Sequence, residues 1–360
     1  MKSNTRELTA ICVMVLIPKI FLSILPDMIS VSGTAGWYVE IATALLCLAG
    51  LFPVFGLMKL YPQKNLSEII RLILGKYAGG AVCLLLFVYF TAHFADLVGE
   101  AIQLIKVYHF PKTPFFVFVL GFLIVAWILG QQGWYGMIQT AERFSLLTLV
   151  AVVAVLLLGF QQYDARLLFP LGGYLPLRSG IGVLGGLSMY SEAVLILLSL
   201  PNRVSRKKAQ RALTRGVLIF GGAVTLACLG YLMTFGVHAS KGKTVGLLEI
   251  VQNVYFNQLF QRTEAIFFLV MVMACCTGIC IQMKLLTLSV TELFRIPEHS
   301  RLTLPLYGVV FLLTMLRRIS GNGESLTVKY LFQYSGGIVF AVVTVLWLIA
   351  LWKKRRSRNA

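Results

Sequence analysis

Residues 16–26 read Leu16-Ile17-Pro18-Lys19-Ile20-Phe21-Leu22-Ser23-Ile24-Leu25-Pro26 and form the centre of the first long apolar stretch of the chain. Pro18 has no backbone N–H, and its ring clashes with the preceding turn, so we expect a helix through this stretch to kink or open there. Lys19 follows directly, and an ionisable group at membrane depth costs roughly 2.5–3.5 kcal/mol on insertion scales. A lysine at this depth therefore needs either a function or a buried partner.

Apolar stretches of similar length recur along the whole chain. Of the 360 residues, 58% are apolar and 13% are charged, and the mean hydropathy is +0.83. This composition excludes a disordered chain, a collagen-like chain, a small disulfide scaffold and an ordinary soluble enzyme. A membrane-crossing helix needs about 20 mostly apolar residues. Ten segments meet this requirement, at about 8–30, 37–59, 80–107, 114–131, 141–160, 180–200, 213–236, 262–288, 303–317 and 329–352.

The ten segments divide naturally into two sets of five. The sequence therefore predicts an all-α polytopic membrane protein with ten transmembrane helices and a 5+5 inverted repeat, in which helices 1 and 6 are broken. The first repeat covers about residues 8–160 and the second about 180–352, within a single membrane domain of residues 1–360. A basic tail at 353–360 follows the last helix.

The positive charges lie mostly in the short gaps between apolar segments. The chain carries 32 Lys and Arg against 14 Asp and Glu, a formal net charge of +18. Nucleic-acid-binding proteins gather such charges on one folded face, so nucleic acid is not an expected partner. The segments on the same side of the membrane as the N-terminus hold about twice as many Lys and Arg as the segments on the other side. This bias predicts that both termini are cytoplasmic.

A second stretch rich in helix breakers opens the sixth apolar segment. It begins Pro170-Leu171-Gly172-Gly173-Tyr174-Leu175-Pro176 and continues through Gly185-Gly186-Leu187-Ser188-Met189-Tyr190-Ser191-Glu192. Two interpretations are open, since glycines here would either unwind the helix at a binding site or allow close packing. If the two broken helices face each other, Glu192 is the candidate partner of Lys19. The lysine would then clamp a substrate carboxylate, take the place of a coupling cation, or form a structural ion pair.

The third segment carries a polar stripe of five residues: Tyr89, His93, Asp96, Glu100 and Gln103. Their spacing keeps them within an arc of about 80° on a helix. Lipid does not tolerate such a face, so we expect it to point inward. His93 and Asp96 would form either a proton relay or a hydrogen-bonded strut between helices. No second histidine accompanies them, so no metal site is expected.

Other features have structural interpretations. Residues 65–74 and 244–260 have amphipathic patterns and are expected to lie along a membrane interface. Glu264, and similarly Glu142 with Arg143, begin apolar segments and are expected to act as anchors. The seven cysteines lie within apolar segments as small buried residues. No nucleophile–base motif, phosphate-binding loop or HExxH is present, so the sequence predicts neither an enzyme nor a cofactor.

Three blocks of the chain resemble the endospore germination permease family, the B subunits of GerA-type nutrient receptors. The first runs from Phe169-Pro170-Leu171-Gly172-Gly173-Tyr174 through Ser188–Glu192 to Leu198-Ser199-Leu200-Pro201. The second is Gln261-Arg262-Thr263-Glu264-Ala265-Ile266-Phe267, and the third runs from Gly133 to Arg143. The order and spacing of the blocks are similar to those of the family over most of the chain.

This resemblance implies a fold of the amino acid–polyamine–organocation superfamily, similar to LeuT, and a germinant-sensing subunit in the inner membrane of a spore or in a bacterial cell membrane. It also implies a central pocket for a small nutrient such as an amino acid, and a receptor A subunit and a lipoprotein C subunit as partners. The chain departs from such permeases in having Pro18-Lys19 where a glycine-rich break is usual. The alternatives are a proton-coupled amino acid permease that transports its substrate and a membrane-embedded enzyme or scaffold. The candidate substrate-binding residues are Pro18, Lys19, Ser23, Tyr89, His93, Asp96, Glu100, Gly185, Gly186, Ser188, Tyr190 and Glu192.

Overall fold

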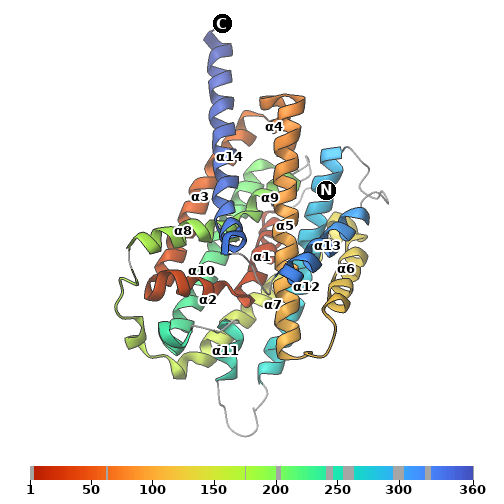
Figure 1. Ribbon diagram of the computed structural model, residues 1–360. Helices are drawn as coiled ribbons and strands as arrows, with labels where there is room; N and C mark the ends of the chain where they lie inside the picture. Colours follow the sequence, from red (N-terminus) through yellow and green to blue (C-terminus); the bar gives the residue numbers. More distant parts are fainter. Residues whose placement is uncertain are drawn as a thin grey trace.

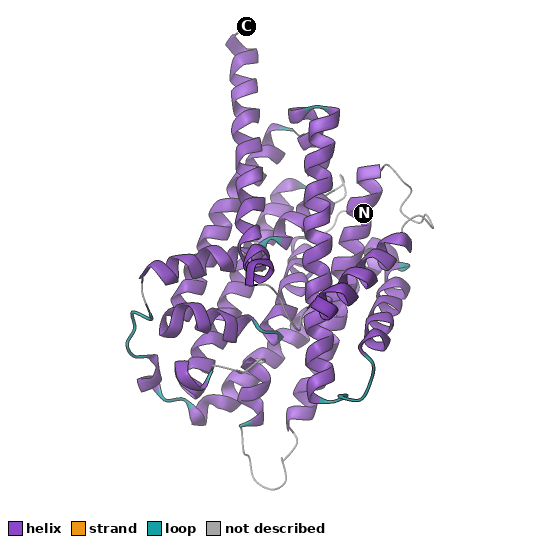
Figure 2. Ribbon diagram, viewed as in Figure 1, coloured by secondary structure: helices purple, strands orange, loops and turns teal. Residues whose placement is uncertain are grey.

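The computed structural model describes residues 4–61, 64–174, 176–199, 204–240, 246–253, 263–294, 304–320 and 326–359. Every regular element in these ranges is a helix (Figure 2). The α-helices are α1 (Thr5–Leu16), α2 (Ile24–Ser32), α3 (Gly36–Leu60), α4 (Leu66–Leu74), α5 (Lys76–Tyr108), α6 (Phe115–Gly130), α7 (Gly133–Leu158), α8 (Pro176–Tyr190), α9 (Glu192–Ser199), α10 (Arg206–Ala239), α11 (Gly246–Gln252), α12 (Thr263–Phe294), α13 (Leu304–Ser320) and α14 (Leu326–Asn359). Short 3₁₀ helices are η1 (Ile17–Phe21), η2 (Gly33–Ala35), η3 (Gly159–Gln162) and η4 (Ala165–Leu168).

Several of these helices have the length and composition of membrane-crossing segments. Seven helical stretches of the described chain are long and apolar enough to cross a membrane. The shorter apolar helices Phe115–Gly130 and Leu304–Leu316 accompany them. Large apolar side chains such as Leu45, Leu85 and Leu157 are exposed on the outer helices. This pattern is that of an integral membrane protein, because such surfaces are stable in lipid and not in water.

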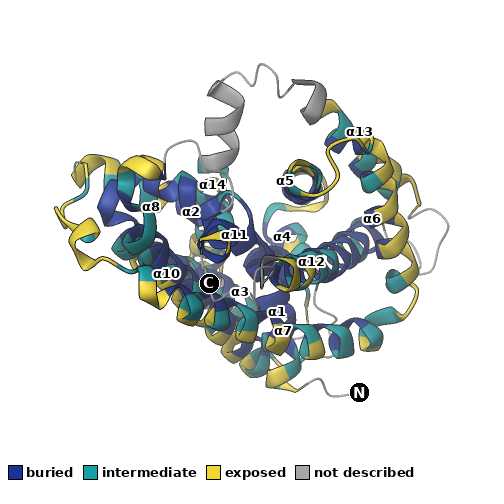
Figure 3. Ribbon diagram, turned by 90° about the horizontal axis from the view of Figure 1, so that it is seen from below, coloured by how far each residue is buried: buried dark blue, intermediate teal, exposed yellow. Residues whose placement is uncertain are grey.

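Helix α1 and the 3₁₀ segment η1 lie at the centre of the bundle. Every residue from Ala10 to Leu22 is buried, and α1 packs against α10, α7 and α12 (Figures 1 and 3). A helix that is apolar on all sides belongs in a protein core or in lipid, and the burial of these residues places this one in the core. Around this centre, α5 packs on α12 and α13, and α14 packs on α8 and α3. The labelled chain ends both lie in the upper half of Figure 1.

The first long apolar stretch is a broken helix, as the sequence predicted. The α-helix ends at Leu16, and Pro18 lies in the first turn of the 3₁₀ segment η1. The backbone then becomes extended at Leu22, with φ −97° and ψ −157°, before α2 begins at Ile24. The missing N–H of Pro18 explains the change, because an α-helix cannot continue its hydrogen-bond ladder through that position.

The sixth apolar stretch is also broken, at a different place from the glycine-rich segment. Helix α8 ends at Tyr190 and α9 begins at Glu192, so the interruption is at Ser191. Gly185 and Gly186 are helical residues of α8, and the interpretation of them as unwound is wrong. A Cβ at Gly186 would lie 2.8 Å from the side chain of Thr43 in α3, so this glycine permits close helix packing.

The two predicted interfacial helices have different environments. Helix α4 is hydrogen-bonded to the end of α12. Glu292 accepts hydrogen bonds from Asn65 and from Ser67 Oγ (3.0 Å). Arg71 donates to the carbonyl of Leu293 (2.6 Å). Asn65 occupies the N-cap position, but its side chain makes no capping hydrogen bond.

Helix α11 is buried from Gly246 to Val251, and it packs against α12, α7, α10 and η1. The prediction that this segment lies along the membrane surface is therefore wrong for the described residues 246–253, because a helix surrounded by protein presents no face to an interface. The rest of that predicted segment lies outside the described residues.

The last helix includes the basic tail. Helix α14 continues without interruption to Asn359, and Lys353 donates to the carbonyl of Ile73 at the end of α4 (2.6 Å). A cation at the C-terminal end of a helix interacts favourably with its last carbonyl groups. Residues 353–359 are thus a helical extension of α14, which projects past the other helices in Figure 1.

Candidate functional site

The interruptions of the two broken helices meet at Lys19. Its Nζ donates to Glu192 Oε2 (2.5 Å) and to the backbone carbonyl of Met189 (2.6 Å). Lys19 is 5% exposed and Glu192 is 2% exposed. The Met189 carbonyl belongs to the last turn of α8, where carbonyl groups lose their helical partners, and the ammonium group supplies one. The sequence prediction that Glu192 is the partner of Lys19 is therefore confirmed.

Glu192 has a second ionisable neighbour on α5. His93 Nδ1 lies 3.0 Å from Glu192 Oε1, a contact that becomes an ion pair when the imidazole is protonated. Among the described residues, Oε1 has no partner besides His93, so it retains acceptor capacity. One buried carboxylate is thus held between an ammonium group and an imidazole, with one oxygen available to a further donor.

The backbone around Ser191 is stabilised by side chains. Tyr89 OH donates to Ser191 Oγ (3.1 Å), and Ser191 Oγ donates to the Ser188 carbonyl (2.8 Å). Ser188 Oγ accepts from the backbone N–H of Gly336 in α14 (2.9 Å). These contacts join α5, α8 and α14 at the interruption.

The interruption of the first helix is stabilised from α12. Gln282 is 1% exposed, and its Nε2 donates to the carbonyl of Val15 near the end of α1 (2.8 Å). A Cβ at Gly278 would lie 2.7 Å from the carbonyl of Met14, so α12 approaches α1 closely at this point. Gln282 is a site residue that the sequence analysis missed, although a glutamine in the middle of an apolar helix was the available signal.

The stripe on α5 extends from the buried centre to an exposed end. His93 and Asp96 are partly buried, whereas Glu100 and Gln103 are exposed. The exposure of the polar side chains on this face of α5 therefore increases with distance from Glu192. His93 contacts Glu192, because the interruption of the sixth helix brings the glutamate beside the imidazole. Glu100 is within electrostatic range of Lys19.

The structure brings together Lys19, Tyr89, His93, Ser188 and Glu192 at the two interruptions, where Pro18 forms part of η1. Of the other candidates, Glu100 lies within electrostatic range of Lys19, whereas Ser23, Tyr190, Gly185 and Gly186 do not contact this group through their side chains. Ser23 precedes α2 and makes no side-chain cap. Tyr190 points to Glu40 of α3, to which its hydroxyl donates a hydrogen bond. Gly185 and Gly186 lie inside α8, and Asp96 and Glu100 lie further along α5.

The remaining predicted anchors contribute little to this site. Glu142 lies 3.8 Å from Arg6, and both side chains are substantially exposed, so the pair is weak. Gln261, Arg262 and the side chain of Glu264 lie outside the described residues. In the described part of the chain, no group of three or more His, Cys, Asp or Glu residues is arranged to hold a metal ion.

Comparison with known proteins gives both a family and a fold. Residues 4–322 match the model of a family described as "Spore germination protein". The spore germination protein YndE of Bacillus subtilis (strain 168) is 21% identical over 332 residues, which cover 90% of this chain and 89% of that protein.

Solved transporters share the fold. A mutant of the manganese transporter of Eremococcus coleocola superposes with a TM-score of 0.57 at 16% identity, covering 97% of this chain and 76% of that one. A substrate-bound, outward-open Na⁺-coupled sialic acid symporter gives a TM-score of 0.57 at 12% identity, covering 97% and 78%. These similarities concern the fold, which is that of LeuT-like transporters.

Proposed function

Because the chain belongs to the family of spore germination proteins, we propose that it is the nutrient-binding membrane subunit of a spore germination receptor. The observation that carries this proposal is the contact of Lys19 with Glu192 and Met189 where two broken helices meet. In transporters of this architecture, substrates bind where such helices are interrupted. The ligand would be a small nutrient such as an amino acid.

The proposed membrane topology has ten crossings in two sets of five. The crossings would be α1 with α2, then α3, α5, α6 and α7, followed by α8 with α9, then α10, α12, α13 and α14. Each set would begin with a broken helix. The distribution of Lys and Arg supports cytoplasmic termini. Family membership supports a location in the spore inner membrane or in a bacterial cell membrane. The partners would be the A and C subunits of the receptor.

The charges of the site suit a zwitterion. The carboxylate of an amino acid would pair with Lys19, and its ammonium group would take Glu192 Oε1 and the Met189 carbonyl that Lys19 releases. One ion pair would then become two, so no buried charge is left without a partner. A ligand with only a carboxylate would separate Lys19 from Glu192 and would require a proton on His93 to compensate.

This difference can be measured with purified protein in lipid nanodiscs. Thermal-shift measurements against a panel of amino acids, matching carboxylic acids and matching amines should give the largest stabilisation with an amino acid. The affinity of a simple carboxylic acid should rise as the pH falls, because its binding needs a protonated His93. Stabilisation by amines alone, unaffected by removal of Lys19, would contradict the proposed site.

A second candidate function is proton-coupled transport of the same ligand. It is favoured by His93 beside Glu192, because the imidazole is charged only when it is protonated and its proton could move with the ligand. Uptake of radiolabelled amino acid into proteoliposomes, with and without a pH gradient, separates the two functions. Accumulation driven by the gradient would establish transport, whereas binding without accumulation would support a sensing subunit.

A further inference from the structure

A second buried glutamate lies on the opposite side of the Ser191 interruption. Glu40 of α3 is 0% exposed, and its Oε1 accepts a hydrogen bond from Tyr190 OH. Its other oxygen, Oε2, has no hydrogen-bond partner among the described residues. Tyr190 is the last residue of α8 and stands two positions before Glu192. Glu40 therefore contacts the end of the broken helix without belonging to the Lys19 cluster.

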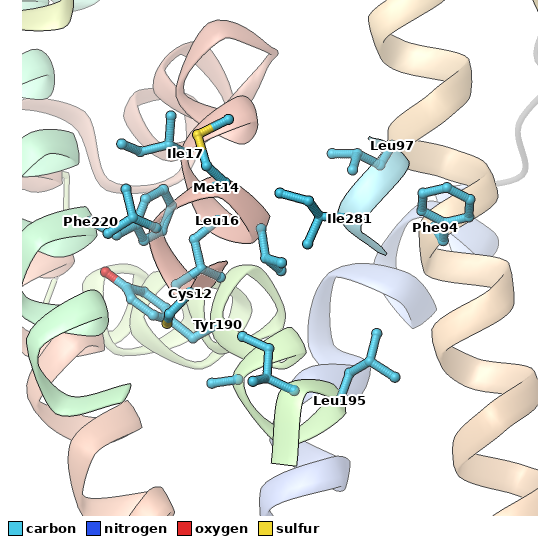
Figure 4. Packing of buried hydrophobic residues seen from close by; sticks show 14 of the residues in the cluster. Cys12, Met14, Leu16, Ile17, Phe94, Leu97, Tyr190, Leu195, Phe220 and Ile281 are labelled. Atoms are coloured by element: carbon cyan, nitrogen blue, oxygen red, sulfur yellow. The ribbon is translucent and has the colours of Figure 1, made fainter. Parts of the chain in front are cut away.

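In the part of the chain that the structure describes, no cation pairs with Glu40. Of the elements packed against α3, helix α8 places Tyr190 beside this carboxyl group and α10 places Cys228, while α3 itself adds Cys47. The described residues of α2, η2, α4 and α14 place no ionisable group within electrostatic range of it. Tyr190 itself is packed edge-on against Phe220 of α10, with ring centroids 5.2 Å apart, and lies among Cys12 and Leu16 (Figure 4).

The two buried glutamates differ in the partners of their carboxyl groups. Glu192 has an ammonium group in contact with one oxygen and an imidazole beside the other. Glu40 has one phenol and an unpaired oxygen. An ionised carboxylate buried without a cation is strongly disfavoured, and such a group takes up a proton instead.

We propose that Glu40 is a proton-binding site of this protein, protonated in this structure, whose carboxyl group holds α8 against α3 beside the interruption of the sixth helix. Loss of the proton to water would leave an unpaired buried charge. The charge would be relieved when α8 separates from α3 and admits water. Because Tyr190 and Glu192 flank the same residue, this movement would displace Glu192 from Lys19. The state of one proton would thereby control the ligand site, whatever the ligand is.

Infrared spectroscopy of the full chain in lipid nanodiscs tests the protonation directly. The wild-type protein should show a carbonyl band of a protonated carboxylic acid at neutral pH, and Glu40→Gln should lose it. Glu142→Gln is the matched control, because Glu142 is partly exposed and lies 3.8 Å from Arg6. Its spectrum should keep the band. A wild-type spectrum without the band, or a band that survives Glu40→Gln, would overturn the proposal.

A second variant keeps the test informative if Glu40→Gln fails to fold. Tyr190→Phe removes the hydroxyl but retains the carboxyl group, so the band should remain and shift to higher frequency as its hydrogen bond is lost. An unchanged band in Tyr190→Phe would show that the absorbing group is not Glu40. Addition of sodium or potassium should leave the wild-type band in place, and its disappearance would mean that the carboxylate binds a metal cation instead.

Discussion

Lys19 Nζ and Glu192 Oε2 lie 2.5 Å apart although the two residues are separated by 173 positions in the chain. The ammonium group comes from the 3₁₀ segment that follows Pro18, and the carboxylate comes from the first residue after the interruption at Ser191. The pair thus links the two broken helices and uses groups that their interruptions expose. A ligand that enters this site must compete with the pair or join it.

The first prediction concerns stability. Lys19→Met should destabilise the protein by about 3–5 kcal/mol, because Glu192 is left buried with a single partner. Glu192→Gln should have an effect of similar size by leaving the ammonium group unpaired. The double variant Lys19→Met with Glu192→Gln should recover much of the loss, since neither charge remains. Thermal unfolding of the three variants measures this coupling, and additive losses would show that the pair is not an energetic unit.

The second prediction concerns pH. His93 lies beside Glu192 and is charged only when it is protonated, so ligand affinity should change with pH. His93→Gln should remove the part of this dependence that comes from the imidazole. Asp96→Asn should shift the pH profile only if Asp96 acts on His93 one turn away on α5. Binding measured across the pH range checks both variants, and an unaltered profile in His93→Gln would exclude the imidazole.

The third prediction concerns the Gln282 side chain. Gln282→Leu removes the donor to the Val15 carbonyl and leaves that group buried, which should cost about 1–3 kcal/mol. Because freed carbonyl groups of broken helices bind cations in some transporters, the variant should also become more stable in sodium than in choline buffer. The wild-type protein should show no such preference. Gln161→Leu, at an exposed position in η3, is the control.

The fourth prediction uses neighbouring glycines of α14. A Cβ at Gly336 would overlap the backbone of Ser188, whereas a Cβ at Gly337 would meet nothing within 4 Å. Gly336→Ala should therefore destabilise the protein by about 1–3 kcal/mol through overpacking. Gly337→Ala should be neutral or stabilising by about 0.5–1 kcal/mol, because alanine is the better helix former. Equal effects of the two substitutions would contradict the close approach of α8 and α14.

The sequence was sufficient to predict the broken helices and the charge pair between them. Pro18 identifies the first interruption because its chemistry is local, and Lys19 with Glu192 follows from the cost of burying charges. The position of the second interruption was not predictable in this way. Glycines that permit packing and glycines that permit unwinding look alike in a sequence, and only the approach of Thr43 to Gly186 assigns the first role.

Two important residues on other helices could not be predicted from the sequence. Gln282 and Glu40 are single polar residues in apolar stretches, and neither has a partner that sequence spacing can reveal. Their importance comes from the carbonyl of Val15 and the hydroxyl of Tyr190, which tertiary packing brings beside them. Amphipathic spacing likewise misplaced α11, because a short helix can present its apolar face to protein as well as to lipid.

Binding of an amino acid to the purified chain, compared between the wild type and the double variant Lys19→Met with Glu192→Gln, tests the central claim most directly. The double variant removes both charges of the pair, so a loss of binding cannot be attributed to an unfolded protein when its unfolding temperature is retained. We expect the wild type to bind and the double variant to lose at least about tenfold in affinity, or about 1.4 kcal/mol. Equal affinities for the two proteins would place the ligand elsewhere and contradict the account.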